Sequence, residues 1–285
     1  MLALLLGLPG LGIAQARFDF SRELAFAQYL QDKDEPSEAL KAIADLDTAG
    51  LSAAQKDSLY YERGWLEYTL KLLDPSAADF LRVDSGSARF YKSRYFAAYE
   101  NGYLGRLDDA SGIVRGIRAG DTTLPLAELS AFEEAGLNLL ARNYAGFDSS
   151  ARAFSYRSYA FSTEERHLVL DDSAMRHYRR KSPWLAGFYS AVVPGLGKVY
   201  AGRKLQGISA FLPVVALGAL TYEAYRKGGV KDARFWIYGS AFTVFYIGNI
   251  WGSALSVHVK EKEFFKEYDT QILFDLHIPL RNLFD

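Results

Sequence analysis

The spacing of hydrophobic residues along the chain changes after Trp184. Between about residues 18 and 160, apolar residues recur every three or four positions, which is the pattern of an amphipathic α-helix. Regular alternation of apolar and polar residues, which would indicate a β-strand, does not occur in this part. Two long apolar runs follow, over 205–225 and 235–257. The pattern predicts an all-α protein with a polar helical part followed by a hydrophobic one.

Each of the two apolar runs has about the 20 residues that a membrane-spanning helix requires. The first run has no charged residue before Glu223, and the second has none. A soluble helix of this length normally carries a polar face, but the second run offers only Ser, Thr and Asn249. The runs are therefore predicted to form a transmembrane helical hairpin, with a kink at Pro213 in the first helix. Aromatic residues typical of a membrane interface flank the loop between the runs: Tyr222, Tyr225, Trp236 and Tyr238.

The second run contains a Gly-x-x-x-Gly pattern, formed by Gly248 and Gly252. In lipid, such small residues let two helix backbones pack closely. The predicted contact is with the other helix of the hairpin, or alternatively with a second copy of the chain in a homo-oligomer. Asn249, between the two glycines, is expected to form a hydrogen bond across the helix interface.

The most distinctive string precedes the first run: Pro194-Gly195-Leu196-Gly197-Lys198-Val199-Tyr200-Ala201-Gly202-Arg203. The apolar segment 184–193 before it is too short to span a membrane, and Pro194-Gly195 is expected to end this half-helix at the interface. Gly197 and Gly202 permit a tight reversal, and Tyr200 and Arg203 are expected to anchor it at headgroup depth. The predicted membrane-interface motif comprises Pro194, Gly195, Gly197, Tyr200, Gly202, Arg203 and Gly207.

These residues resemble the hallmark of a bacterial two-helix membrane domain, Pro-Gly-x-Gly-Gln-x-Tyr-x-Gly followed by Arg or Asp. The resemblance covers about residues 183–257, and the chain departs from it at Lys198, where glutamine is usual. It implies a membrane domain and no particular chemistry. A phosphate-binding loop is rejected, because the third glycine, the preceding strand and the following acidic residue are missing.

Small and large packing residues recur in the polar part of the chain. Two antiparallel helices approach closely only where one offers Gly or Ala and a large residue of the other fills the notch. Gly105 suits the turn between two such helices, because a left-handed C-terminal cap costs glycine little. The spacing of Ala39, Ala78 and Ala110 drifts about the tetratricopeptide-repeat period of 34 residues. The chain therefore resembles this repeat family over about residues 20–150.

The repeat resemblance implies a curved superhelix of helical hairpins whose concave face binds a peptide or another protein. The second unit is predicted to carry an insertion at Lys71–Leu73, and a fourth unit around Ala135 and Tyr144 is faint. Tyrosine and arginine are common in binding hot spots, although the same helical spacing suits core aromatics. The candidate partner-binding residues are Tyr60, Tyr61, Arg63, Tyr91, Arg94, Tyr95 and Tyr99.

The N-terminus has the pattern of a secretory signal. A short apolar run from Leu2 to Ala14 leads to the small-x-small sequence Ala14-Gln15-Ala16. No basic residue precedes the run, because the first one is Arg17. A signal peptide over 1–16 places the repeats outside the membrane, in the periplasm of a bacterium. The alternative is a buried first helix of a cytosolic domain.

Two further segments carry patterns. Ser162 as N-cap and Glu165 three residues later form a capping box, which predicts a new helix there. The helix leads to a basic cluster at 176–181, which is either drawn to anionic headgroups or solvated. After residue 258, alternating apolar residues from Ile272 to Leu280 indicate a partial strand, which either docks on the repeats or adds to a partner's sheet.

Composition narrows the function classes. The formal net charge is -1, so the concentrated basic surface of a nucleic-acid binder is not expected. The chain has no cysteine, and its four histidines are dispersed without the i, i+4 spacing of a helical metal site. The sequence thus predicts no metal, no cofactor and no catalytic residue.

The predicted protein is a non-enzymatic scaffold of the bacterial cell envelope, held in the inner membrane. Its repeats would bind a protein partner, in membrane-protein insertion or envelope assembly. The alternative is a small transporter or lipid-interface enzyme that uses the interface motif. The predicted parts are a signal peptide (1–16), a repeat domain (17–160), a basic linker helix (161–182), a membrane hairpin (183–257) and an amphipathic tail (258–285).

Overall fold

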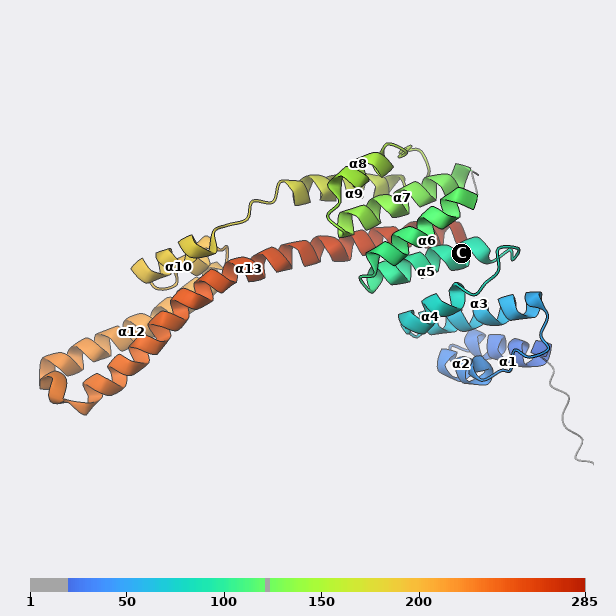
Figure 1. The fold of residues 1–285 in the computed structure, drawn as a ribbon. Coiled ribbons are helices and arrows are strands. Elements are labelled where there is room, and N and C mark those ends of the chain that lie inside the picture. Colours follow the sequence, from blue (N-terminus) through green and yellow to red (C-terminus); the bar gives the residue numbers. More distant parts are fainter. Residues whose placement is uncertain (1–19, 121–123, 285) are drawn as a thin grey trace, which may run out of the picture. The chain divides into compact units, whose positions relative to one another are not determined.

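A computed structural model describes residues 20–120 and 124–284 of the chain (Figure 1). Across these residues the secondary structure is helical and contains no strand. The predicted all-α class is confirmed. The predicted signal peptide lies outside the described residues. The chain divides into two compact units at Ser130, within helix α7, and Phe284 belongs with the first unit.

The first unit consists of successive helical hairpins. Its helices are α1 (Phe20–Asp32), α2 (Pro36–Ala44), α3 (Ala53–Thr69), α4 (Leu73–Phe80), α5 (Phe90–Tyr103), α6 (Leu107–Gly120) and the start of α7 (Leu124–Leu140). Helices α1 and α2, α3 and α4, and α5 and α6 pack in pairs. The first pair contacts the second through α2 and α3, and the second contacts the third through α4 and α5. Figure 1 labels these helices in chain order.

Small residues allow the close packing of these hairpins. A Cβ added to Gly64 on α3 would lie 3.0 Å from the ring of Phe80 on α4, so the ring fills the space that glycine leaves. Ala39 and Ile43 on α2 are fully buried against Leu59 and neighbouring apolar residues. The small-and-large packing that the sequence predicts is therefore present at these positions. The choice of Ala78 as a packing residue is wrong, because Ala78 is exposed and the buried small residue five positions after the turn at Lys71 is Ser76, as Ala39 follows Asp34.

The same turn joins the helices of four hairpins. A residue with positive φ ends the first helix of each, and the next N–H donates to the carbonyl five residues earlier, as in the Schellman cap. The positive-φ residues are Asp34, Lys71, Gly105 and Arg142, spaced 37 (71 − 34), 34 (105 − 71) and 37 (142 − 105) residues apart. The insertion predicted at Lys71 is wrong, because Lys71 occupies the turn position itself. The fourth unit, faint in the sequence, has the same turn.

The second unit runs from Ala131 to Leu283. After α7 it contains α8 (Tyr144–Ala151), α9 (Ser162–Arg176), α10 (Pro183–Val192), α11 (Leu196–Tyr200), α12 (Lys204–Gly228), the 3-10 turn η1 (Gly229–Lys231) and α13 (Ala233–Phe284). Helix α9 begins at Ser162 as predicted, but Ser162 is not its N-cap. The carboxylate of Glu165 instead accepts hydrogen bonds from the N–H groups of Ser155 (3.2 Å) and Tyr156 (2.8 Å).

The predicted C-terminal strand is wrong, because α13 continues without a break to Phe284. The alternating apolar residues of the tail include Ile272, Leu276 and Leu280. These three lie four residues apart, so they share one face of a helix. These three side chains are buried, while Phe274 is exposed. Leu276 packs on Gly136 of α7, where any added Cβ would clash with its side chain.

The tail packs against α7–α9 within the second unit. Arg142 donates two hydrogen bonds to the carboxylate of Asp269, at 2.7 and 2.9 Å. His167 Nδ1 of α9 lies 3.3 Å from Asp275 Oδ1. Of the predicted alternatives for the tail, packing on the chain itself is therefore observed, by a helix in place of a strand.

Candidate functional site

The glycines of the predicted interface motif bring backbone segments into close contact. A Cβ on Gly195, whose φ is 84°, would lie 2.1 Å from the carbonyl oxygen of Gly207. One on Gly197 would lie 1.8 Å from the carbonyl oxygen of Ala186. A Cβ on Gly207 would lie 2.5 Å from the side chain of Val199. These three positions exclude every other side chain on steric grounds.

The reversal after the half-helix differs in detail from the prediction. Helix α10 ends at Val192, before Pro194, as expected. Gly202 has a φ of 94° and forms the turn into α12. Gly197, however, lies inside the short helix α11, where its role is close contact with α10.

A chain of hydrogen bonds joins α10, α11 and α13. The Gly197 N–H donates to Ser190 Oγ at 2.9 Å, and the Ser190 hydroxyl donates to Ser253 Oγ at 2.7 Å. The Ser253 hydroxyl donates in turn to the carbonyl of Asn249, at 2.7 Å. Both serines are fully buried. Sequence reasoning missed them, since a lone serine in an apolar run gives no signal of a partner 63 residues away.

Tyr200 and Arg203 are both held by contacts with neighbouring residues. Lys181 donates to the Tyr200 carbonyl at 2.6 Å, and the Tyr200 hydroxyl accepts a hydrogen bond from the Ser182 N–H at 3.3 Å. Arg203 forms an ion pair with Glu263 of α13. These contacts fix the turn that connects α10 to α12.

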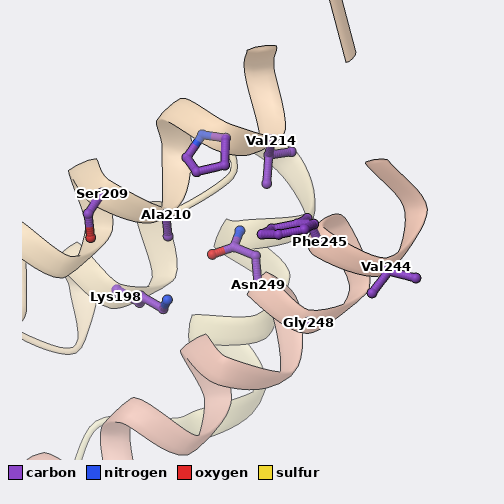
Figure 2. Close-up of a pocket in the computed structure, with 9 residues that line it drawn as sticks. Lys198, Ser209, Ala210, Val214, Val244, Phe245, Gly248 and Asn249 are labelled. Carbon is purple, nitrogen blue, oxygen red and sulfur yellow. The ribbon is translucent and has the colours of Figure 1, made fainter. Parts of the chain in front are cut away.

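A cavity of about 420 Å³ lies beside this turn, between α11, α12 and α13 (Figure 2). Three polar side chains line it, Lys198, Ser209 and Asn249, and the rest of its wall is apolar or glycine. Asn249 is only 5% exposed, and neither atom of its amide has a hydrogen-bond partner. The interhelical hydrogen bond predicted for Asn249 is therefore absent from the described part of the chain.

The two glycines of the Gly-x-x-x-Gly pattern border this cavity. No atom lies within 4 Å of a Cβ added to Gly248, and this residue lines the cavity wall. The nearest neighbour of a Cβ on Gly252 is the end of the Lys198 side chain, at 3.7 Å. Within the described residues, these glycines make room for Lys198 and the cavity, and they do not bring two helix backbones together.

Some of the predicted partner-binding residues are buried or paired within the first unit, and the others are partly exposed. Tyr95 is fully buried, and its hydroxyl lies 2.8 Å from the carbonyl of Leu126 and 2.7 Å from Ser130 Oγ, so it belongs to the core. Arg63 pairs with Asp79, and Arg94 donates to the carbonyls of Phe80 and Val83. The tyrosines that remain partly exposed are Tyr60, Tyr61, Tyr91 and Tyr99.

Cations stack on the aromatic rings of α3. The guanidinium of Arg89 lies 4.4 Å from the ring centre of Tyr61, and the ammonium of Lys92 lies 4.2 Å from that of Trp65. Trp65 stacks on Tyr61, one turn away, at 6.4 Å. We call Tyr61, Trp65, Arg89 and Lys92 the aromatic-cation face. Trp65, Arg89 and Lys92 were missed in the sequence because their proximity depends on the packing of α3 and α5.

Phe284, which belongs with the first unit, contacts helix α5. The ring of Phe284 lies 5.8 Å from that of Tyr95, and its carbonyl accepts a hydrogen bond from Lys92 at 3.0 Å. The last described residue thus contacts the same helix, α5, that carries part of the aromatic-cation face.

Helices α3 and α5 of the first unit also carry two buried carboxyl groups, Glu67 and Glu100. Burial raises the pKa of Glu100 to about 8, and burial followed by the nearby charge of Asp79 raises the pKa of Glu67 to about 7. Ser76 Oγ lies 2.5 Å from Glu100 Oε1 and 2.8 Å from the Gly64 carbonyl. A hydroxyl has a single proton. If Ser76 donates it to Gly64, a protonated Glu100 can donate to Ser76.

The described residues contain no group of three or more His, Asp or Glu side chains placed to hold a metal ion. Comparisons with protein-family models, curated proteins and solved structures find no match to this chain. Neither resemblance drawn from the sequence is therefore supported by a relative.

Proposed function

We propose that this protein is a membrane-anchored scaffold of the bacterial cell envelope. In this proposal α12 and the first part of α13 span the inner membrane as a hairpin. The helical repeats bind a protein partner, in membrane-protein insertion or envelope assembly. The proposal rests mainly on the apolar side chains that α12 and α13 leave exposed.

The segment Lys204–Lys231, which comprises α12 and η1, is long and apolar enough to cross a membrane. Few of its residues are buried, in contrast to the core helix of a soluble protein. Exposed apolar residues on this helix include Leu205, at 82%, and Leu212, at 61%. Such a continuous apolar surface favours contact with lipid over contact with water.

The first part of α13 supports a second span. Tyrosine, tryptophan, serine and Asn249 lower its mean hydropathy below that of α12, but 235–257 contains no charge. Val244 and Trp251 are each 69% exposed. Gly218 of α12 faces Phe242 of α13, and Gly239 of α13 faces Thr221, so the two helices lie side by side.

Arginine at Val244 is expected to reduce the fraction of the chain that stays with membranes after alkaline extraction. A charge near the centre of a spanning helix costs about 2.5–3.5 kcal/mol in insertion. The matched control is Leu170→Arg on α9, because Leu170 is similarly exposed, at 66%, but lies outside the proposed spans. Equal extraction of the two variants would contradict the second span.

The proposed topology predicts opposite labelling of two engineered cysteines. The chain has no cysteine of its own, so exposed residues can be replaced one at a time. In intact spheroplasts an impermeant maleimide is expected to label Ser85→Cys in the repeats. It should label Lys231→Cys, in the basic loop between α12 and α13, only after permeabilisation. The reverse pattern would place the repeats in the cytoplasm.

The proposed partner site is the aromatic-cation face. Aromatic rings and arginine supply most of the binding energy in many protein interfaces. A photo-crosslinking residue at Tyr61 is expected to give a discrete protein adduct in cells, and the same residue at the fully exposed Tyr159 is not. Lys92→Glu should remove the adduct by reversing one charge of the face.

Adducts of equal yield at both positions, or an adduct unaffected by Lys92→Glu, would contradict this site. The identity of the crosslinked protein then distinguishes the two proposed processes. An insertion factor points to membrane-protein insertion, and a component of envelope construction points to assembly.

A further inference from the structure

The cavity between α11, α12 and α13 has a polar end and an apolar wall. Lys198 of α11 and Asn249 of α13 project toward the same space, as Figure 2 shows, with Ser209 of α12 at its edge. The apolar wall includes Val214 and Phe245. The cavity is thus built from three separate helices, and its two ends differ in chemistry.

Asn249 lacks a partner although it is almost entirely buried. Both its amide nitrogen and its amide oxygen are without a hydrogen bond in the described part of the chain. Burial without a hydrogen-bond partner is unfavourable for a polar group. The cost is expected to persist in an apolar span unless a bound group supplies the missing acceptor and donor.

Lys198 adds a positive charge to the same cavity. Its side chain is half-buried beside Gly252, and no carboxylate in the described residues pairs with it. Charged side chains at membrane depth usually pair with an opposite charge or reach a polar region. The cavity therefore presents one cation and one amide that need an anionic, oxygen-rich ligand.

We propose that this cavity binds the anionic phosphate headgroup of a membrane lipid. The phosphate oxygens accept hydrogen bonds from the Lys198 ammonium and from Asn249 Nδ2, and a hydroxyl of the headgroup donates to Asn249 Oδ1. An acyl chain lies along Val214 and Phe245. Basic pockets between transmembrane helices bind such headgroups in this way. This site rests on the proposed membrane spans and adds a lipid ligand to the scaffold role, which does not require one.

The size and lining of the cavity favour a lipid over free phosphate. A water molecule occupies about 30 Å³ in the liquid, so a cavity of about 420 Å³ is much larger than a bare phosphate ion. Most of its wall is apolar, so it offers few hydrogen bonds to a phosphate ion but suits a hydrocarbon chain. The spans of a second copy could pair with Asn249, but they would leave the Lys198 charge unmatched. Their single acidic residue, Glu223, already pairs with Lys227.

The test is native mass spectrometry of the full chain in mild detergent. The chain is titrated separately with phosphatidylglycerol, with phosphatidylcholine and with inorganic phosphate. The expected result is a retained phosphatidylglycerol adduct. Phosphatidylcholine should be retained weakly, because its headgroup carries no net charge, and inorganic phosphate should not displace the adduct.

Two variants and one control locate the adduct. Lys198→Gln is expected to weaken phosphatidylglycerol retention about tenfold or more, because a hydrogen bond between two charged groups is lost. Asn249→Leu should also weaken it. Lys204→Gln removes the same charge from an exposed position six residues away and should leave retention unchanged. Lys198→Gln keeps the test decisive even if Asn249→Leu fails to fold.

Four results would overturn the proposal. Equal losses in Lys198→Gln and Lys204→Gln would indicate general surface electrostatics. Equal retention of phosphatidylcholine and phosphatidylglycerol, or displacement by inorganic phosphate, would exclude an anionic-lipid site. A bound second copy that Asn249→Leu removes, with lipid retention unchanged, would assign the cavity to an interface between copies.

Discussion

Replacing Gly197 with alanine is expected to destabilise the segment from α10 to α13 by about 3 kcal/mol, at the upper end of overpacking costs. The added Cβ would lie 1.8 Å from the carbonyl oxygen of Ala186 and 2.7 Å from Ser190 Oγ. Because the first contact is with a backbone atom, only a displacement of α10 from α11 relieves the clash. That displacement also breaks the hydrogen bond from the Gly197 N–H to Ser190.

Titration with sodium dodecyl sulfate in mixed micelles measures this loss. The experiment uses a Trp65→Phe background, in which the remaining tryptophans, Trp184, Trp236 and Trp251, all report on the segment from α10 to α13. The control is Gly248→Ala, where the new Cβ meets no atom within 4 Å. This control should be neutral or slightly stabilising, because alanine favours a helix by up to about 1 kcal/mol over glycine. Equal unfolding midpoints for the two variants would contradict the packing described for Gly197.

Replacing Glu100 with glutamine changes the free energy of unfolding of the first unit by an amount that depends on pH. This change is expected to be more stabilising at pH 8 than at pH 5, by several kcal/mol. The folded protein raises the pKa of Glu100 from 4.5 to about 8 because the carboxyl is buried. In the unfolded chain this group loses its proton near pH 4.5, while the native protein keeps it until about pH 8. The group's contribution to stability is therefore fully present below pH 4.5 and is lost as the pH rises through 8.

A pKa raised from 4.5 to about 8 corresponds to about 5 kcal/mol, at 1.36 kcal/mol per pKa unit. Glutamine carries no charge and can still donate to Ser76 Oγ, so Glu100→Gln should lose less stability between pH 5 and pH 8 than the natural chain. Glu67, whose pKa is raised to about 7, contributes a dependence of the same sign that remains in the variant.

Urea denaturation of the full chain at several pH values checks this expectation. The reporter is Trp65, with the other three tryptophans replaced by phenylalanine, because Trp65 packs against Phe96 of α5 at 5.1 Å. Glu35→Gln, at an exposed turn position, serves as the control and should leave the pH dependence unchanged. A natural chain equally stable at pH 5 and pH 8 would show that Glu100 is not held protonated.

The helical hairpins were predictable because their signals are local. The three- and four-residue spacing of apolar residues determines which face of a helix is buried. Gly105 marked its turn, since glycine accepts positive φ without steric cost. Lys71 and Arg142 adopt the same conformation, but side chains rarely do so, and their sequence carries no sign of it. Only the repeated turn identifies them as equivalent positions.

The tail shows how a local pattern can support the wrong structure. Apolar residues at every second position predict a strand, yet every second member of that series also lies on one helix face. The choice was made by packing, because Leu276 fits the space left by Gly136 of α7. Residues 272–280 alone do not reveal that contact.

The sequence by itself determined the all-α class, the two long apolar runs and the chain reversal around Pro194, because helix periodicity, charge and glycine content act over a few neighbouring residues. Tertiary structure alone decided what the motif glycines contact, which aromatic residues are buried and where Asn249 points. Those outcomes depend on helices separated by tens of residues in the chain. The cavity of Lys198 and Asn249 is of this second kind, because its polar atoms come from helices whose proximity no single segment encodes.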